Sequence, residues 1–465
     1  MNANEQLPAE RAEHGKAART TAPRRSHAVF EPAADRPDPV ALLEQQGRGR
    51  IADLLPIRYG RMLASPFAFL RGAALIMATD LTGTPATGIT VQACGDAHLS
   101  NFGVYASPER RLVFDVNDFD ETLPAPWEWD VKRLATSIEV AARVNGDRPA
   151  KRRDLVRAAV ARYRTTMHEL AGQAELAVWY AAAELDELGA QYQKAIGSGL
   201  RKLGREDLAR LQNRDARESV RDLVHTVHGR PRIIARPPLV VPVDDLPGPQ
   251  VANTSRPGLE HVLAVYRRSL PPDRQYLLNR FQVADAARKV VGVGSVGMGC
   301  WILLLTGRDD SDLLMLQVKQ ATTSALSQFA GPTRYLSQGK RVVTGQQLMQ
   351  ATSDIFLGWH PAPGNESGVG DSYLRQLRDW KYSAPVEAMP TATMHRYGQL
   401  CGQALARAHA RSGDRIAIAA YLGTSTQFDD AVADFAVAYA DQNERDFAAL
   451  TAAHQAGQIK AETGV

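Results

Sequence analysis

GDAHLSNFG, residues 95–103, and LVFDVNDFDE, residues 112–121, are the most informative stretches of this sequence. They place Asp96 and Asn101 shortly before an apolar segment that ends in acidic residues. Phosphoryl transfer requires little covalent chemistry from the protein. One carboxylate positions the nucleophile, and Mg²⁺ bound by an Asn and a second Asp neutralises the charge of the phosphates. The two stretches therefore predict a metal-assisted phosphoryl-transfer site.

The apolar segment 112–116 predicts a buried strand, and acidic residues crowd beside it: Asp115, Asp118, Asp120 and Glu121. Like charges beside a core raise one another's pKa values unless a cation or basic side chains relieve them, which favours a bound metal. A strand advances about 3.3 Å per residue, so Asp115 and Asp118 would lie about 10 Å apart and share an ion only if the chain turns. We expect Asp118 to be the main ligand, with Asn101 and Asp115 as further candidates.

A second phosphate signature lies downstream in VGVGSVGMGCWILLL, residues 291–305. Its GxGxxG spacing lets backbone amides approach phosphate oxygens, and the candidate binding residues are Gly292, Gly294, Ser295 and Gly297. The run lies between two expected strands and not before a helix, so it predicts a hairpin over phosphates and not a dinucleotide fold. Lys319 follows on the next strand, where a kinase places its phosphate-binding lysine.

Each of these motifs also has a purely structural interpretation. The acidic run could cap a turn and pair with Lys132 and Arg133. The glycine-rich run could be a hairpin with close backbone packing, and a lysine at a strand end is commonly a solvated charge. An aromatic cluster is as consistent with core as with the wall of an acceptor pocket: Trp127, Trp129, Trp179 and Tyr180.

Length and composition limit the possible classes. A chain of 465 residues with 44% hydrophobic and 23% charged residues is typical of a globular protein with more than one core. The net charge of +4 is small and basic residues are spread among acidic ones, so we expect no nucleic-acid partner. No apolar run reaches the roughly 18 residues of a membrane span, so we expect no membrane partner. The cysteines lack metal-ligand spacing and no secretory leader is recognised, which indicates the cytoplasm.

The order of patterns along the chain predicts its domains. Residues 1–38, rich in Ala, Arg, Glu and Pro, are expected to be disordered. Residues 39–245 are expected to form a helical lobe, residues 246–385 a β-rich nucleotide-binding lobe, and residues 386–465 helices that return to the first lobe. The clearest expected helices span 66–81, 127–144, 154–171, 174–196 and 258–270.

These motifs resemble two known groups. GDAHLSN is similar to the catalytic loop of aminoglycoside and choline phosphotransferases, the small-molecule branch of the protein-kinase-like superfamily, and NDFDE followed by WEWDVKRLA resembles their metal-binding strand and next helix. Through FLRGAA, FDVNDFDE, LARAHARSGD and YLRQLRD, the chain after residue 40 resembles the uncharacterised bacterial family called domain of unknown function 2252.

The first resemblance implies ATP and Mg²⁺ as cofactors and a role for each matching residue. Asp96 resembles the catalytic base, and His98 matches a loop histidine of structural role. Asn101 and Asp118 resemble the Mg²⁺ ligands. The remaining matches are to the nucleotide loop and the phosphate lysine: Gly292, Gly294, Gly297 and Lys319.

Two departures from the superfamily pattern matter. The glycine-rich loop and lysine normally precede the catalytic loop but follow it here, which implies an α+β, protein-kinase-like two-lobe fold with circularly permuted lobes. The helix at 400–414 should then pack beside GDAHLSN and bring His409 and Asp414 near the site, although a helix histidine is more commonly solvated or at the edge of the core. The second departure is that no Asp or Glu lies between Lys319 and Asp354 to pair with the lysine. The partner then comes from elsewhere, with Asp354 a distant candidate, or the lysine has none.

We therefore expect an enzyme, an ATP- and Mg²⁺-dependent phosphotransferase that acts on a hydroxyl of a small-molecule acceptor with Asp96 as base. Nucleotidyl transfer at the same site is one alternative. A non-catalytic nucleotide-binding module that regulates a partner is the other. The sequence names neither the acceptor nor the oligomeric state.

Overall fold

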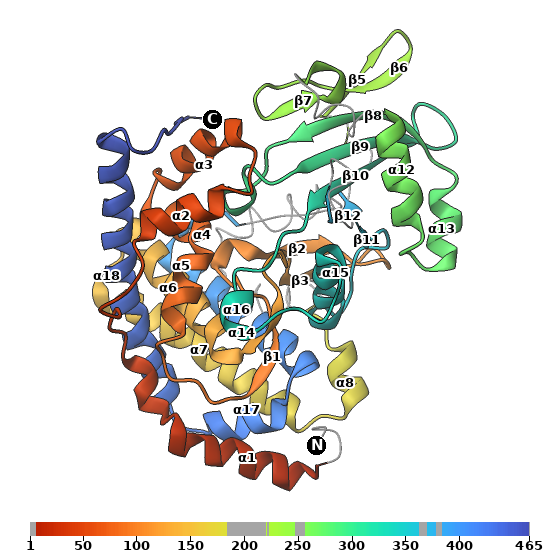
Figure 1. Ribbon diagram of the computed structural model, residues 1–465. Coiled ribbons are helices and arrows are strands. Elements are labelled where there is room, and N and C mark those ends of the chain that lie inside the picture. Colours follow the sequence, from red (N-terminus) through yellow and green to blue (C-terminus); the bar gives the residue numbers. More distant parts are fainter. Residues whose placement is uncertain are drawn as a thin grey trace.

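Figure 1 shows the computed structural model, which describes residues 6–183, 220, 223–246, 256–361, 370–377 and 384–464. A body of helices fills the lower and left part of the view, and a lobe built on an antiparallel sheet lies at the upper right. We call these the helical body and the strand lobe. The expected mixed α+β class is confirmed at this level.

The strand lobe is an antiparallel sheet with the order β11–β12–β10–β9–β8–β7. Its strands are β7 Val240–Pro242, β8 Gln282–Lys289, β9 Cys300–Thr306, β10 Leu313–Gln320, β11 Gly358–His360 and β12 Ser372–Gln376. The apolar strands β9 and β10 are buried on both faces. Helices α12 (Arg256–Arg267) and α13 (Pro272–Leu278) cover one face, and the hairpin of β5 (Val224–Val227) and β6 (Arg230–Ile233) covers the other.

The hairpin expected at the glycine-rich run is present, and a second hairpin follows it. Residues 290–299, the glycine-rich loop, join β8 to β9, and residues 307–312 join β9 to β10. On β10, Lys319 lies in register with Cys300 of β9 and Tyr373 of β12. Strand β7 lies at one edge of the sheet and pairs with β8, so this lobe includes residues before the expected boundary at 246.

The helical body is built around α6 (Trp127–Val144), whose residues are buried almost throughout. Figure 1 shows α18 along its left edge, and α16 packs against α7. Further helices of the body are α2 Pro39–Gly47, α3 Leu55–Met62, α4 Pro66–Gly72, α5 Ala74–Leu81, α7 Pro149–Ala171, α16 Thr391–Ser412, α17 Arg415–Leu422 and α18 Gln427–Gln455. The body also contains two short strand pairs: β1 Thr90–Ala93 with β4 Leu123–Pro126, and β2 Phe102–Ala106 with β3 Leu112–Val116.

The N-terminal segment is ordered where the sequence predicted disorder. Residues Pro8–Thr21 form helix α1 and Arg24–Ala28 a 3₁₀ turn, η2, which pack on α17 and α18. Arg19 donates to the carbonyl oxygen of Tyr421 at 2.9 Å, and the buried His27 lies 2.7 Å from the Tyr421 hydroxyl. The polar composition was misleading because this segment is stabilised by docking onto distant helices and not by a core of its own.

Two expected helices also differ from the structure. The span 66–81 is interrupted at Ala73, whose backbone leaves the helical region, so it forms α4 and α5. The span 174–196 contains α8 (Glu175–Tyr180), and its residues from 184 on lie outside the described part of the chain. Among the helices described, none has the length and apolar character needed to cross a bilayer.

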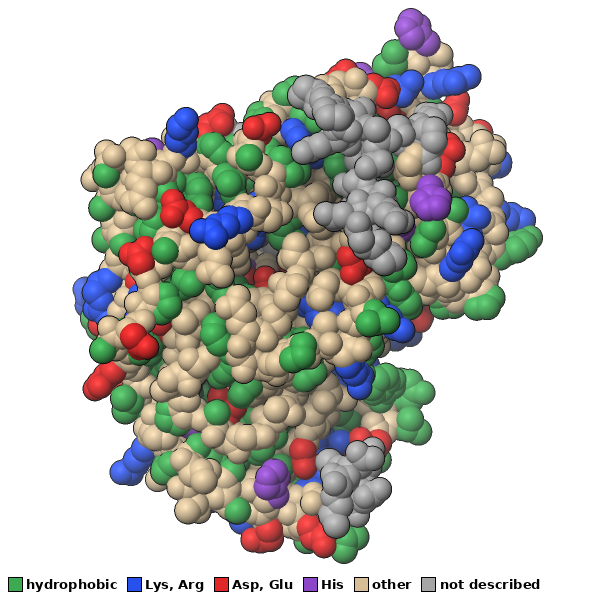
Figure 2. Space-filling view, viewed as in Figure 1, with side chains coloured by type: hydrophobic (Ala, Val, Ile, Leu, Met, Phe, Trp, Pro, Cys, Tyr) green, Lys and Arg blue, Asp and Glu red, His purple; other side chains and the backbone are tan. Residues whose placement is uncertain are grey.

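The face of the molecule in Figure 2 carries Lys, Arg, Asp and Glu side chains intermixed, without one large patch of either sign. Helices α14 (Ser327–Ala330) and α15 (Gln338–Met349) follow β10; α14 packs on β4, and α15 contacts both α16 of the helical body and β11 and β12 of the strand lobe. A cavity lined by several charged side chains lies between the strand lobe and the helical body.

Candidate functional site

The sequence GDAHLSN forms a tight loop after β1, residues 94–101, that ends in the 3₁₀ turn η4 (Leu99–Asn101). Gly95 has a φ of +82°, and a Cβ there would collide with the backbone carbonyl of Glu121. Only glycine combines this backbone conformation with this close approach at low cost. The loop is therefore pressed against the acidic segment that follows β3.

Helix α6 holds the 94–101 loop through one polar face. The Asp130 carboxylate accepts hydrogen bonds from the backbone N–H groups of Cys94 at 2.6 Å and Gly95 at 2.9 Å. Arg133 Nε donates to Asp96 Oδ1 at 2.8 Å, and Ser137 Oγ accepts from the Leu99 N–H at 3.1 Å. Positions 130, 133 and 137 share one helix face, so one rigid element positions the whole loop.

Asp96 and Asn101 close the loop on itself. Asn101 Nδ2 donates to the backbone carbonyl of Asp96 at 2.8 Å. This hydrogen bond uses the amide nitrogen, so the amide oxygen of Asn101 is the atom that can accept a hydrogen bond or bind a cation. Burial raises the pKa of Asp96, while the neighbouring Arg133 guanidinium opposes that rise. A carboxylate with a raised pKa is suited to accept a proton near neutral pH.

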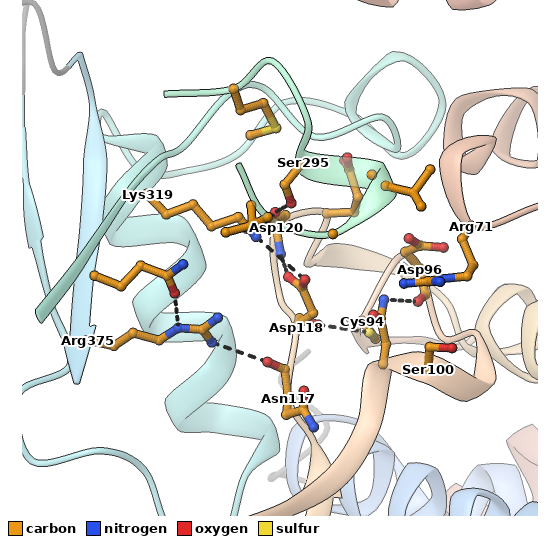
Figure 3. A pocket seen from close by; sticks show the side chains of 18 of the residues that line it. Arg71, Cys94, Asp96, Ser100, Asn117, Asp118, Asp120, Ser295, Lys319 and Arg375 are labelled. Atoms are coloured by element: carbon orange, nitrogen blue, oxygen red, sulfur yellow. Dashed lines mark hydrogen bonds and ion pairs between the residues drawn. The ribbon is translucent and has the colours of Figure 1, made fainter. Parts of the chain in front are cut away.

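The β2–β3 hairpin returns the chain from Asn101 to the acidic run. Phe102 of β2 pairs with Val116 of β3, and the backbone N–H of Asn117 donates to the Asn101 carbonyl at 2.9 Å. Figure 3 shows Asp118 directed into the cavity. Asp115 does not reach the cavity, because its side chain is buried on β3. Burial raises the pKa of Asp115, and the nearby Arg407 opposes that rise. The expected 10 Å separation along a strand explains why the two acids do not converge.

Lys319 reaches these acids from the strand lobe. Its Nζ lies 3.5 Å from Asp118 Oδ2 and forms an ion pair with Asp120 Oδ2. Ser295 Oγ donates to Asp120 Oδ2 at 3.2 Å, and the Tyr373 hydroxyl donates to Asp120 Oδ1 at 2.9 Å. Burial opposes the charge of Lys319, yet the two carboxylates raise its pKa well above the usual value.

The acidic run thus pairs with Lys319 across the two parts of the molecule. The sequence also allowed the acidic run to pair with Lys132 and Arg133. In the structure these two residues have other contacts: Arg133 binds Asp96, and Lys132 lies over the Phe435 ring. Asp354, the distant candidate partner, instead accepts from the backbone N–H of Phe356. Asp118 and Asp120, which precede Lys319 in the sequence, supply its carboxylate partners.

These groups line one cavity of about 380 Å³ between the helical body and the strand lobe. The lining includes the predicted residues Asp96, Asn101, Asp118, Gly292, Gly294, Ser295 and Lys319. Gly297 lies outside the lining, where its carbonyl accepts from the Ile51 N–H at 2.7 Å and a Cβ would press on Arg50. Within the described part of the chain, no group of three or more His, Cys, Asp and Glu side chains is placed to hold a metal ion.

Other candidates from the sequence have structural places. Burial lowers the pKa of His98 well below its usual value, and its Nε2 lies 3.5 Å from Asp96 Oδ2, so it is a neutral neighbour of that carboxylate. Burial raises the pKa of Cys94 well above the usual value, which disfavours a thiolate. Trp127 is fully buried and stacks on Tyr163. The aromatic residues suggested as an acceptor wall are absent from the described cavity lining.

Helix α16 packs beside the 94–101 loop, as the expected return of the C-terminal helices requires. His409 Nε2 lies 3.1 Å from Asp130 Oδ2, and the Tyr397 hydroxyl donates to the carbonyls of Leu99 at 3.0 Å and Phe102 at 2.9 Å. His409 therefore contacts the residue that holds the loop. Asp414 does not lie at the cavity: it caps α17 and pairs with Arg11.

A model of one protein family matches residues 50–453 of the chain. The chain belongs to that family, the uncharacterized proteins conserved in bacteria (DUF2252). Comparison with curated proteins and with solved structures finds no match. The match to the DUF2252 family spans both halves of the cavity, from Asp96 in the helical body to Lys319 in the strand lobe.

Several cavity residues of this DUF2252 chain were not among the predicted site residues. Asp120 was noted only as part of the acidic run, yet it binds Lys319, Ser295 and Tyr373. Arg71 of α4 and Arg375 of β12 also line the cavity. The useful signal for Arg71 is a charged residue inside an otherwise apolar segment, PFAFLRGAALIM.

Proposed function

We propose that this protein is an ATP- and Mg²⁺-dependent phosphotransferase that phosphorylates a hydroxyl of a small molecule. The observation that carries the proposal is the meeting of two distant segments at one cavity. Asp96, Asn101 and Asp118 approach it from the helical body, and the glycine-rich loop and Lys319 from the strand lobe. Its volume of about 380 Å³ falls within the range of small-molecule sites.

The succession of elements in the strand lobe supports a permuted, protein-kinase-like two-lobe fold. The glycine-rich loop joins β8 to β9, Lys319 lies on the next strand β10, and α15 follows before β11 and β12. Kinases likewise place a glycine-rich loop over the phosphates, a lysine on the third strand and a helix after it. The difference is in α15, which carries no acid for the lysine; its Arg341 donates to the Asp120 and Thr122 carbonyls.

The donor set fits Mg²⁺, which takes oxygen ligands and needs only one or two carboxylates from a chain. The Asp118 side chain is 30% exposed, against 16% for Asp96 and Asp120, so it is the carboxylate most open to a cation. Asp118 and the Asn101 amide oxygen would hold the ion, which neutralises phosphate charge when bound. Asp96 would accept the proton of the attacking hydroxyl, and Lys319 would exchange its carboxylates for phosphate oxygens.

Calorimetry of nucleotide binding tests this proposal. Asp118→Asn should remove Mg²⁺-dependent ATP binding, whereas Asp115→Asn, a matched change outside the cavity, should leave it intact. Asp96→Asn should retain ATP binding but slow phosphoryl transfer to a hydroxyl-compound library by about 10²- to 10⁴-fold. Wild-type protein that binds no ATP in the presence of Mg²⁺, or equal loss in both first variants, would sink the proposal.

One observation favours a non-catalytic nucleotide-binding module as the second candidate. Arg133 engages Asp96 Oδ1 at 2.8 Å, and such pairing restrains a carboxylate that must accept a proton. Such a module would bind ATP and produce no phosphorylated acceptor. The Asp96→Asn substitution would then change neither result. Product mass also separates nucleotidyl transfer, in which the acceptor gains AMP and not one phosphate.

A further inference from the structure

Arg71 lies at the junction of the cavity's two halves. It is near the C-terminal end of α4, which packs against the glycine-rich loop. A Cβ on Gly292 would lie 3.9 Å from Arg71 Nη2, and one on Gly294 would lie 3.4 Å from the Arg71 carbonyl. Figure 3 shows Arg71 beside Asp96, and the two charges influence each other's pKa. The guanidinium therefore lies between the loop and the proposed base.

The charge of Arg71 is poorly compensated. Its Nε is buried without a hydrogen-bond partner in the described part of the chain. The two carboxylates that act on it have other partners: Asp96 binds Arg133, and Glu387 accepts from Ser65 at 2.7 Å. Burial lowers the pKa of Arg71, but an arginine remains protonated at neutral pH. A partly buried cation whose Nε lacks a hydrogen-bond partner is stabilised when an anion joins it, so the geometry calls for an anionic ligand.

We propose that Arg71 binds the terminal phosphate of the nucleotide and stabilises it during transfer, as a catalytic arginine supplied by the chain itself. This inference rests on the proposed phosphotransferase function. The acceptor oxygen forms a bond to the terminal phosphorus while the bond from that phosphorus to the bridging oxygen breaks. The hydroxyl proton goes to Asp96, and ADP leaves with the bridging electron pair. Arg71 contacts the phosphoryl oxygens on which charge accumulates.

The position of Arg71 favours the terminal phosphate over the rest of the nucleotide. Figure 3 shows Asp118 between Lys319 and Asp96, so phosphate oxygens that take the place of the Lys319 carboxylates would lie away from the proposed base. Arg133 is already engaged by Asp96. Arg71 is thus placed to supply positive charge where the phosphoryl group would meet the base. An anionic group on the acceptor has the same chemistry, and the experiment separates these two sources.

The test compares the affinities of Mg²⁺·ADP and of Mg²⁺ with a non-hydrolysable ATP analogue, measured by calorimetry. Arg71→Gln should weaken the ATP analogue by roughly ten- to hundredfold and leave ADP unchanged, because only the analogue has a terminal phosphate for the arginine to bind. The affinity of Arg71→Lys for the ATP analogue should lie between those of wild type and Arg71→Gln. Arg61→Gln is the control: Arg61 holds the glycine-rich loop at the Val291 carbonyl, so its loss should weaken both nucleotides alike.

Thermal unfolding supplies a readout that separates binding from structure. Arg71→Gln should unfold at the same or a higher temperature than wild type, since it removes a partly buried charge whose neighbouring carboxylates have other partners. A lower unfolding temperature, or equal weakening of ADP and analogue, overturns the inference. Unchanged affinity for both nucleotides overturns it too and assigns the anion to the acceptor. Wild type that binds neither nucleotide overturns the proposed function and this inference together.

Discussion

At Gly95 a single backbone conformation sets the start of the 94–101 loop. Its φ of +82° is unfavourable for any side chain, and the Glu121 carbonyl occupies the space a Cβ would need. Gly88 has a nearly identical φ of +78° with nothing within 4 Å of its Cβ position. The two glycines therefore separate the cost of the conformation from the cost of the close approach.

We expect Gly88→Ala to lower the free energy of unfolding by about 1–2 kcal/mol, the usual cost of the left-handed conformation. Gly95→Ala should lower it by more than about 3 kcal/mol, because the Glu121 backbone must also move. Urea unfolding of both variants checks this. Equal losses would show that the close approach to Glu121 carries no cost.

At the scale of single residues, the sequence indicated which residues line the candidate site but not how they pair. Asp96, Asn101, Asp118 and Lys319 were selected because oxygen ligands, a base and a phosphate cation are residue types that the chemistry demands. The partners of Lys319 were not predictable, because Asp118 and Asp120 meet it only after the two parts of the molecule dock. Asp115 was a candidate by proximity in sequence, and strand geometry took it out of the cavity.

Helix α6 shows what element-level prediction captures. Its expected span, 127–144, agrees with the observed Trp127–Val144. Its polar residues would ordinarily mark a solvated face, yet Glu128, Asp130 and Lys132 are at most 1% exposed. The helix is buried because α7, α18 and the 94–101 loop surround it, and periodicity in one segment cannot report those neighbours.

Lys132 makes the stability of α6 depend on pH. Its ammonium lies 4.9 Å from the centre of the Phe435 ring, and burial lowers its pKa from 10.5 to about 7, with Glu128 opposing the shift. Between these values the unfolded chain keeps a proton that the folded chain has released, so stability rises with pH. The rise approaches about 1.4 kcal/mol per pH unit for one proton.

Lys132→Met keeps the apolar stem and removes this titration. The free energy of unfolding of wild type minus that of the variant should therefore increase from pH 7 to pH 10, measured by urea unfolding at several pH values. Subtraction cancels the other titrating groups. A difference that stays constant with pH would contradict the lowered pKa.

At the scale of the whole molecule, helices from the end of the chain support a loop near its beginning. His409 of α16 bonds Asp130 of α6 across 279 residues of sequence, and Asp130 in turn holds the Cys94 and Gly95 amides. Tyr163 adds a further contact, with its hydroxyl 2.9 Å from His409 Nδ1. This buried network couples the C-terminal helices to the candidate site.

A double-mutant cycle of His409→Gln and Asp130→Asn measures this coupling. We expect each single variant to lower the free energy of unfolding, and the pair to lose less than the sum by about 1–3 kcal/mol, as for groups that share a buried hydrogen bond. Unfolding in urea supplies the four energies. Additive losses would show that the two side chains act independently.

By itself, the sequence determined the local elements and the candidate chemistry: the β8–β9 hairpin, the span of α6, and a carboxylate, an amide and a lysine suited to phosphate. Hydrophobic periodicity and glycine placement act over a few residues, so they are legible in one stretch of chain. Only the tertiary structure decided which charges meet, that Lys319 pairs with Asp118 and Asp120, that Arg71 lies between the glycine-rich loop and Asp96, and that residues 8–28 are ordered. Those outcomes depend on the packing of segments far apart in sequence, and local patterns carry no information about it.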